Sequence, residues 1–172
     1  MRNGLFIHVK TVSAVALGLL FFAGGCGQQD TSQEWDRITK TYVEAWNTGN
    51  LEILDGIIDA QFVRITGSTT SSEGLDSLKK VIASIRETYP DIHVTVNERI
   101  RSGDLSATRW SWTGTHSGLG NSALKGKQVS NTGMSRSRMT DGKLVEEWVE
   151  TNQLALMMQL GYTLSPPTGA DE

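Results

Sequence analysis

The last strand-like segment of the chain carries the side chains with the clearest potential for proton transfer. Successive residues of a strand point to opposite faces, so one face carries Leu144, Glu146, Trp148, Glu150 and Asn152. If that face lines a cavity, its apolar walls favour the neutral carboxyl of Glu150, which could then act as a general acid or base. Alternatively, Glu150 is a charge near a strand end that reaches solvent or pairs with an arginine.

His116, at the end of another strand-like segment, is the second candidate for proton transfer. An imidazole exchanges protons near neutral pH, so His116 could polarise a ligand carbonyl or relay a proton. The alternative is a strand-end residue bonded to the backbone. His93 alternates with apolar positions and is expected to be exposed. Neither histidine has a second ligand at the spacing of a zinc site, so we expect no metal and no cofactor.

Large apolar side chains are expected to line any ligand cavity. The predicted ligand-binding residues are Trp46, Trp110, Trp112, Trp148 and Met158, with Tyr42 and Met157 beside them. Residues of this type also fill ordinary cores, and the sequence does not separate the two roles. The chain has no Ser-His-Asp arrangement, phosphate-binding glycine loop or dinucleotide fingerprint, because Gly118-Leu119-Gly120 lies between strands and does not open a helix.

Cys26 is the only cysteine and follows a segment typical of exported bacterial lipoproteins. Arg2 and Lys10 precede an uncharged, mostly apolar run over 11–25, shorter than the roughly 20 residues of a membrane-spanning helix. Ala23-Gly24-Gly25 before the cysteine resembles a lipobox, with alanine where leucine is usual. We therefore expect 1–25 to be a cleaved signal peptide and lipid on Cys26 to anchor the protein to the cell envelope, outside the cytoplasm. The alternative is an ordinary signal peptide beside a chance thiol.

Charge and length restrict the partners of the remaining chain. Cleavage removes two of the 16 basic residues and none of the 19 acidic ones, so the net charge changes from −3 to −5. A mildly acidic chain without a basic run is not expected to bind nucleic acid. Residues 26–31 would form a lipidated tether, 32–162 one domain and 163–172 a disordered tail.

Helical patterns precede strand patterns along this domain. Capping boxes at Thr31–Glu34 and Thr70–Glu73 open a first and a third helix, the latter ending before Pro90, with a short helix from Leu51 between them. A short strand over 61–66 precedes the third helix, and four long strands follow over about 92–100, 105–116, 127–139 and 144–152, before a helical turn that ends at Gly161. Glu146 is expected to pair with Arg138 across the last hairpin. The order predicts an α+β fold, a curved antiparallel sheet packed on three N-terminal helices.

Six local motifs in this order resemble the SnoaL-like polyketide cyclase (ester cyclase) family. They are Tyr89-Pro90-Asp91, Gly103-Asp104 before Arg109-Trp110, Gly114-Thr115-His116 with Gly118, Arg138 with Asp141-Gly142-Lys143-Leu144, Glu146 with Trp148, and Gln159-Leu160-Gly161. The resemblance covers about residues 35–162. It implies the cone-shaped nuclear-transport-factor-two-like fold and a cavity for a small molecule.

Two positions depart from the family pattern. The resemblance places an acid/base aspartate of the family's cyclases at Asn152, and a frequent family histidine at Ile65. An amide has no titratable proton, and losing a general acid or base costs about 10²- to 10⁴-fold in rate. Asn152 could still orient a carbonyl or a water.

Three functions remain open at this point. The first is a lipoprotein that binds a small apolar or aromatic molecule, which predicts a closed apolar cavity anchored by Asn152. The second is a cyclase, isomerase or hydrolase that uses Glu150 and His116, which predicts both side chains inside an open cavity. The third is an interaction module, for example a homodimer, which predicts a filled cavity and an exposed apolar patch on the sheet.

Overall fold

The computed structural model describes residues 26–165, with side chains from residue 31. The predicted signal peptide, the side chain of Cys26 and most of the predicted tail, 166–172, therefore lie outside the described part. Within that part, no helix has the length and apolar character needed to cross a membrane.

Six strands form a single curved sheet that does not close. They are β1 (Ile58–Thr66), β2 (Thr69–Glu73), β3 (His93–Ser102), β4 (Leu105–Thr115), β5 (Gln128–Thr140) and β6 (Lys143–Thr151). Their order is β2-β1-β6-β5-β4-β3. All neighbours are antiparallel except β1 and β6, which run parallel.

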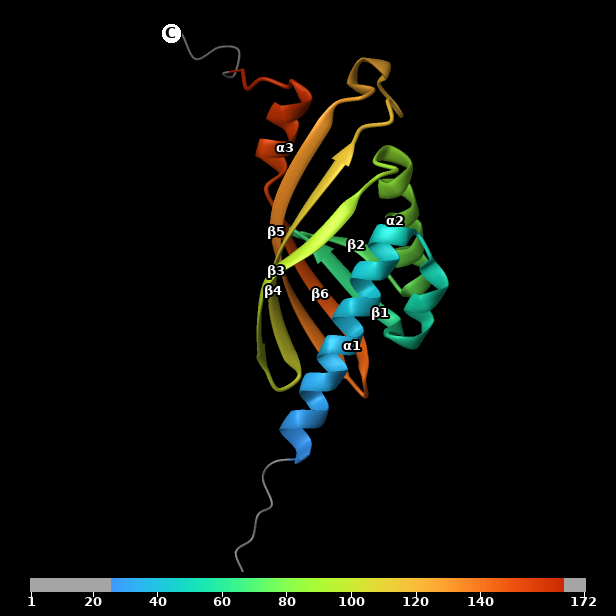
Figure 1. Cartoon of the computed structure of the whole chain (residues 1–172), viewed down its shortest axis with the longest axis vertical. Helices are drawn as coiled ribbons and strands as arrows, with labels where there is room; N and C mark the ends of the chain where they lie inside the picture. Colours follow the sequence, from blue (N-terminus) through green and yellow to red (C-terminus); the bar gives the residue numbers. More distant parts are fainter. Residues whose placement is uncertain (1–25, 166–172) are drawn as a thin grey trace, which may run out of the picture.

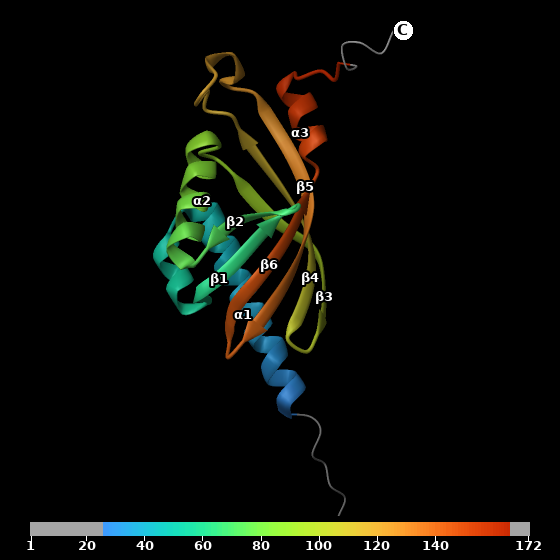
Figure 2. The same ribbon diagram turned by 180° about the vertical axis from the view of Figure 1, so that it is seen from behind.

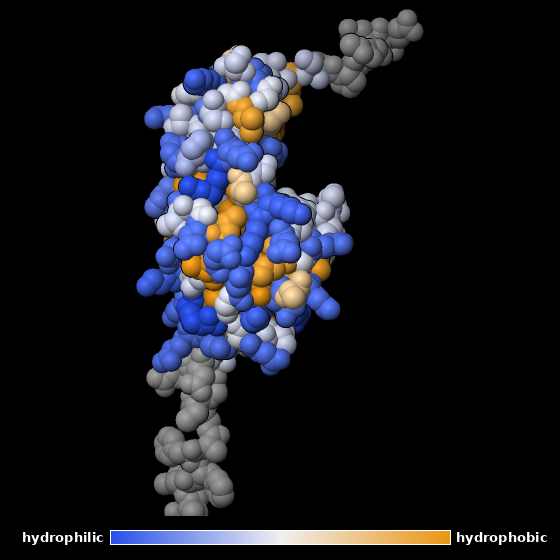
Figure 3. Space-filling view, turned by 90° about the vertical axis from the view of Figure 1, so that its right-hand side faces the viewer, coloured by the Kyte–Doolittle hydropathy of each residue, from blue (hydrophilic) through white to orange (hydrophobic). Residues whose placement is uncertain are grey.

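Helices cover the concave face of this sheet. They are α1 (Cys26–Thr48), the 3₁₀ helix η1 (Leu51–Gly56) and α2 (Leu75–Thr88), while η2 (Ser122–Leu124) lies in a loop and α3 (Gln153–Leu160) follows the last strand. Figures 1 and 2 show α1, η1 and α2 together on one side of the strands, and none of the three on the other. On the helix-bearing side, hydrophilic side chains predominate and apolar ones show between them (Figure 3). The predicted α+β fold is confirmed.

The core lies between the helices and the concave face. Trp35, Ile38 and Ala45 recur at helical spacing on α1 and are fully or almost fully buried, as are Leu78 and Ile82 on α2. This apolar burial drives the packing of both helices onto the strands.

Polar contacts fix the C-terminal end of α1. The Asn47 amide exchanges two hydrogen bonds with the backbone of Val94, at 3.0 and 2.6 Å. The Arg86 guanidinium donates to the carbonyls of Trp46 and Asn47 at 2.6 and 3.0 Å, and so satisfies carbonyls that the helix end leaves open.

Two motifs that carry the family resemblance meet in space. The Asp91 carboxylate accepts hydrogen bonds from the Thr115 amide at 2.6 Å and hydroxyl at 2.7 Å, which hold its pKa below the usual range. A Cβ at Gly114 would lie 3.2 Å from the Cβ of Tyr89. Hydrogen bonds and close packing therefore hold Tyr89-Pro90-Asp91 against the end of β4.

Three local predictions were wrong. The first helix begins at Cys26, not at Ser32, so Thr31–Glu34 lies inside α1 and the predicted tether is helical. Thr70–Glu73 pairs with β1 as part of β2, and α2 is instead preceded by Gly74 at a φ of +81°. Glu146 accepts from Arg136 at 2.9 Å, because Arg138 reaches Asp104 on the neighbouring hairpin.

A bulge in β6 overturns the predicted direction of its side chains. Met139 pairs with Leu144 and Arg138 with Glu146, so Val145 is an extra residue on β6. The alternation shifts by one, and Glu147, Val149 and Thr151 face inward after it. Trp148 is 45% exposed on the outer face, which also carries Glu146 and Glu150. The prediction that Trp148 lines the cavity was wrong, and so was the interpretation of Glu150 as a carboxylate inside it.

Gly133 on β5 allows Trp110 to lie flat across the concave face. A Cβ at Gly133 would lie 2.3 Å from the Trp110 ring and 2.5 Å from the Glu150 carbonyl oxygen. Gly133→Ala should therefore lower the free energy of unfolding by about 1–3 kcal/mol through overpacking. Gly56→Ala is the control, since no atom lies within 4 Å of its added Cβ. Equal denaturation midpoints for the two variants would contradict this account.

Candidate functional site

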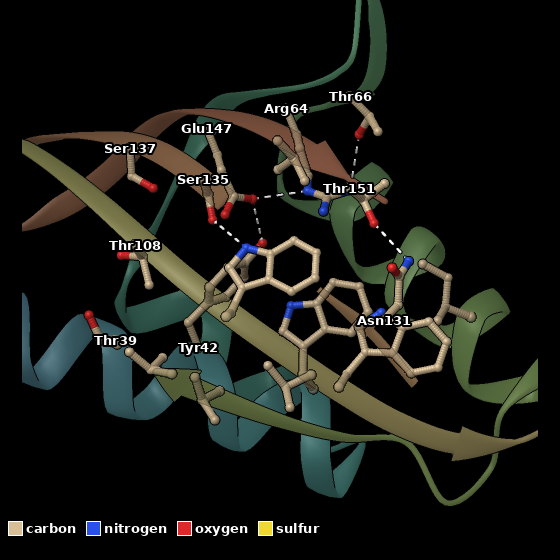
Figure 4. A pocket seen from close by; sticks show the side chains of 18 of the residues that line it. Thr39, Tyr42, Arg64, Thr66, Thr108, Asn131, Ser135, Ser137, Glu147 and Thr151 are labelled. Carbon is tan, nitrogen blue, oxygen red and sulfur yellow. Dashed lines mark hydrogen bonds and ion pairs between the residues drawn. The ribbon is translucent and has the colours of Figure 1, made fainter. Parts of the chain in front are cut away.

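A cavity of about 420 Å³ lies between the concave face of the sheet and the helices. Its lining comes from α1, α2, α3 and all strands except β2. Figure 4 shows polar side chains from β1, β5 and β6 above a cluster of indole rings. The cavity is therefore neither filled nor wholly apolar.

One wall is aromatic. It consists of Trp46, Tyr89, Trp110 and Trp112. The Trp110 indole donates to the Ser135 hydroxyl at 2.9 Å, and the rings of Tyr89 and Trp112 lie 5.0 Å apart. These contacts hold the rings in place before a ligand arrives, which lowers the entropy cost of binding.

Beside these rings, the cavity wall holds a buried ion pair. Arg64 on β1 and Glu147 on β6 face one another because the two strands pair in parallel, with the Cα atoms of these residues in register. Arg64 Nε lies 2.9 Å from Glu147 Oε2, and the side chains are 12% and 6% exposed. The Tyr42 hydroxyl, from α1, donates to the same oxygen at 3.0 Å. The Arg64 guanidinium also lies 5.9 Å from the centre of the Trp46 ring.

These contacts shift the protonation equilibria of the cluster. Burial, and then the negative charge of Glu147, raise the pKa of the Tyr42 phenol far above its ordinary value. Burial alone would lower the pKa of Arg64, but attraction to Glu147 and contact with Tyr42 outweigh it and raise that pKa. The phenol therefore stays protonated and the guanidinium stays charged.

The cluster leaves one acceptor and one donor for a ligand. Both Tyr42 and Arg64 use Glu147 Oε2, and no donor among the described residues reaches Oε1. Arg64 places Nε on the carboxylate and Nη1 3.5 Å from the Thr66 hydroxyl, while Nη2 has no acceptor in the described part of the chain. Neither of these two atoms is fully buried, so a ligand can reach both.

Hydroxyl and amide groups complete the polar lining. The Asn131 amide donates to the Thr151 hydroxyl at 2.9 Å. Ser106, Thr108 and Ser137 add hydroxyls from β4 and β5. Among the described residues, no three His, Cys, Asp or Glu side chains gather where they could hold a metal ion.

The structure places the predicted site residues in three different environments. Trp46, Trp110 and Trp112 line the cavity. Trp148 and Met158 are 45% and 60% exposed, and neither belongs to the lining, so their prediction as ligand contacts was wrong.

The three predicted catalytic side chains also lie outside the lining. Glu150 is exposed on the outer face of β6. The Asn152 side chain accepts from the Ala155 amide at 3.2 Å and caps α3. His116 is buried behind Tyr89, and its Nδ1 accepts from the Gly118 amide at 2.9 Å, which is the backbone-bonded alternative. Glu150 points away from the cavity because the bulge at Val145 shifts the alternation of the side chains that follow it on β6.

Sequence reasoning missed both members of the ion pair. Arg64 precedes Ile65, where the family pattern has a histidine, and Glu147 lies between Glu146 and Trp148, which were assigned to the inner face. Each member of the pair is therefore the sequence neighbour of a residue assigned to the site. A parallel pairing of β1 with β6 would have brought the two charges together, but nothing in the local pattern indicates which strands pair.

An unclosed, curved sheet packed on helices around a ligand-sized cavity defines a cone-shaped α+β protein with an internal binding site. The SnoaL-like polyketide cyclase model matches residues 36–160, and the chain belongs to this family. Family and fold are those of a small-molecule-binding, cyclase-like protein.

Solved structures share this fold. A "putative polyketide cyclase" from Bacillus cereus ATCC 10987 is 26% identical, with a TM-score of 0.67 over 77% of this chain and 84% of that one. IdmH from Streptomyces antibioticus is 28% identical, with a TM-score of 0.66 over 76% of this chain and 99% of that one. AclR from Streptomyces galilaeus is 24% identical, with a TM-score of 0.67 over 80% and 87%, and shows the fold alone. No curated protein sequence matches the chain.

The raised pKa of Tyr42 gives a pH signature for the cluster. An unfolded tyrosine ionises near pH 10, whereas folded Tyr42 keeps its proton, so its contribution to stability is complete below about pH 10 and is lost as the pH rises above that value. In Tyr42→Phe, the free energy of unfolding should fall less steeply above about pH 10, by about 1.4 kcal/mol per pH unit. Denaturant titration at several pH values measures this. The control is Tyr162→Phe, at an exposed position, and a wild-type slope in Tyr42→Phe would contradict the assignment.

Proposed function

We propose that the protein binds a small, uncharged and mostly apolar molecule in the cavity, with the Arg64–Glu147 pair as its polar anchor. The observation that carries this proposal is a buried ion pair in the wall of a cavity of about 420 Å³, a volume within the usual range for small-molecule sites. The aromatic wall supplies apolar contact area. Arg64 Nη2 would donate to a ligand carbonyl, and Glu147 Oε1 would accept from a ligand hydroxyl.

The charge of the wall favours a neutral ligand. The charges of Arg64 and Glu147, 2.9 Å apart, cancel one another, and no other charged side chain of the described residues lines the cavity. A charged ligand would lose its hydration without gaining an unpaired counter-charge, which is costly in an apolar site. A neutral molecule with a hydroxyl or carbonyl group avoids this cost.

A second candidate is proton transfer of the cyclase type by Glu147. A carboxylate with one free oxygen inside the cavity supports it. Against it, Arg64 Nε and the Tyr42 hydroxyl already occupy one oxygen of this carboxylate, which holds the group in place as part of the cavity wall. Binding without turnover is therefore the preferred function. Loss of turnover with retained binding in Glu147→Gln would favour the enzyme instead.

Removing the charged pair should weaken binding. A suitable probe is 6-propionyl-2-dimethylaminonaphthalene, a neutral fluorescent ketone that reports apolar surroundings. In Arg64→Gln/Glu147→Gln, which keeps similar shapes, its dissociation constant should rise about 10-fold or more, as expected for a hydrogen bond from a charged donor. The control is Arg136→Gln/Glu146→Gln, which removes an ion pair of the same kind from the outer face. Equal effects of the two double variants, or no binding by wild type, would reject the proposal.

We further propose that this site works outside the cytoplasm on a lipid-anchored protein. The support is the apolar run that ends at Ala23-Gly24-Gly25-Cys26. In the described part, α1 leads away from the domain at the end opposite α3 (Figure 1). An anchor there would hold the domain near a bilayer, where apolar molecules are concentrated.

Replacement of the cysteine should release the protein. Cys26→Ser removes the only thiol in the chain, so no lipid can be attached there. In bacterial cells the variant should move from the membrane fraction to the soluble fraction, and the fatty-acid mass should disappear from its N-terminal peptide. Gln29→Ser changes a neighbouring residue and should stay with the membrane. A Cys26→Ser protein that remains in the membrane would refute the anchor.

A further inference from the structure

Four hydroxyl groups gather on one stretch of the cavity wall, where β4 pairs with β5. We define the hydroxyl cluster by its residues, Ser106, Thr108, Ser135 and Ser137, all of which line the cavity. The three serines are 3%, 7% and 9% exposed, in chain order, so they are largely withdrawn from bulk solvent. Polar groups at such depth lose free energy of hydration unless they find hydrogen-bond partners.

The strand register makes this cluster compact. Ser106 lies directly opposite Ser137, and Thr108 directly opposite Ser135, with no register shift between the two pairs. Side chains opposite one another on antiparallel strands have Cβ atoms about 4.5–5.5 Å apart. The four hydroxyls therefore occupy one small area of the concave face and can contact a single group of a ligand.

The cluster continues the row of polar side chains that begins with the ion pair. Glu147 on β6 lies directly opposite Ser137 on β5, and Arg64 on β1 lies on the other side of Glu147. Figure 4 shows Ser137 and Thr108 on one side of the Glu147 carboxylate and Asn131 on the other. Because neighbouring strands are about 4.8 Å apart, the cluster lies roughly 5–10 Å from the ion pair along this row.

Much of the hydrogen-bonding capacity of the cluster is unused within the described part of the chain. The Ser137 hydroxyl has no partner there, and those of Ser106 and Thr108 meet only one another, at 3.4 Å. The Ser135 hydroxyl accepts from the Trp110 indole at 2.9 Å, which leaves its own hydrogen free to be donated. The Ser137 oxygen is not fully buried, so a ligand can reach it. A hydroxyl both donates and accepts, so the cluster suits a neutral oxygen group.

We infer that the hydroxyl cluster binds a second oxygen group of the ligand, a neutral hydroxyl, ether or carbonyl about 5–10 Å from the group at the ion pair. This inference rests on the proposed binding function and specifies its ligand as a molecule with two oxygen groups along one edge and an apolar remainder. A ligand without the second oxygen would bury these hydroxyls against carbon, which costs binding free energy. For the same reason, a site built for a ligand hydroxyl rejects the analogue that lacks it.

A matched pair of ligands tests this inference. They are 6-propionyl-2-naphthol and 2-propionylnaphthalene, which differ by one hydroxyl, in mildly acidic buffer that keeps the naphthol neutral. Displacement of 6-propionyl-2-dimethylaminonaphthalene from the full chain gives both dissociation constants. Their ratio measures the preference for the naphthol. In Thr108→Val/Ser137→Ala this preference should fall about 10-fold relative to wild type, as expected for the loss of one hydrogen bond.

The control is Ser111→Ala/Thr132→Val, which removes one serine and one threonine hydroxyl from the same two strands. These two residues lie directly opposite one another and outside the cavity lining, so the control should keep the wild-type preference. The single variants Thr108→Val and Ser137→Ala give the same test if the double variant does not fold.

The outcomes separate this inference from the function on which it rests. If both ligands bind and Thr108→Val/Ser137→Ala keeps the wild-type preference, the inference is overturned and binding in the cavity stands. An equal loss of preference in the control would overturn it as well. If neither ligand nor the fluorescent ketone binds to wild type, the proposed function is rejected, and this inference with it.

Discussion

The buried pair of Arg64 and Glu147 is the interaction on which the rest of the structure depends. It joins β1 to β6, the only parallel neighbours in the sheet, and Tyr42 extends it to α1. Removing two charges from water costs several kcal/mol for each ion, and only mutual attraction with further hydrogen bonds compensates this. The pair therefore specifies one arrangement of sheet and helix. It also gives the cavity a polar wall with no net charge.

One extra residue in β6, Val145, determines which side chains of this strand face the cavity. Without the bulge at Val145, the alternation of β6 would turn Glu146, Trp148 and Glu150 inward and leave Glu147 outside. With the bulge, Glu147 meets Arg64, and Trp148 joins Met134 on the opposite side. The side chains that face the cavity and those exposed on the convex face of β6 are therefore both determined by one irregularity.

Sequence patterns predicted the elements of this fold well and the site poorly. Apolar spacing located both long helices, and alternation located the four long strands, because burial of one face imposes these periods. Trp46, Trp110 and Trp112 line the cavity as expected, and Trp110 and Trp112 share one face because β4 pairs with β5 without a register shift. Glu147 was missed for a physical reason: a bulge leaves no mark in local composition, and one residue of slip exchanges the two faces. The prediction that Thr70–Glu73 opens a helix was wrong because its hydroxyl-bearing residues suit an edge strand equally well.

The position of Asn152 changes how the departure from the family pattern should be understood. Asn152 follows β6, donates its backbone amide to the Thr132 carbonyl at 3.0 Å, and caps α3 with its side chain. Aspartate and asparagine cap helices about equally well, so an aspartate there would serve the same structural role. The identity of residue 152 is thus weak evidence about chemistry in this chain. Glu147 is better evidence, because it is the one carboxylate among the described residues that line the cavity, and Arg64 and Tyr42 hold it in the cavity wall.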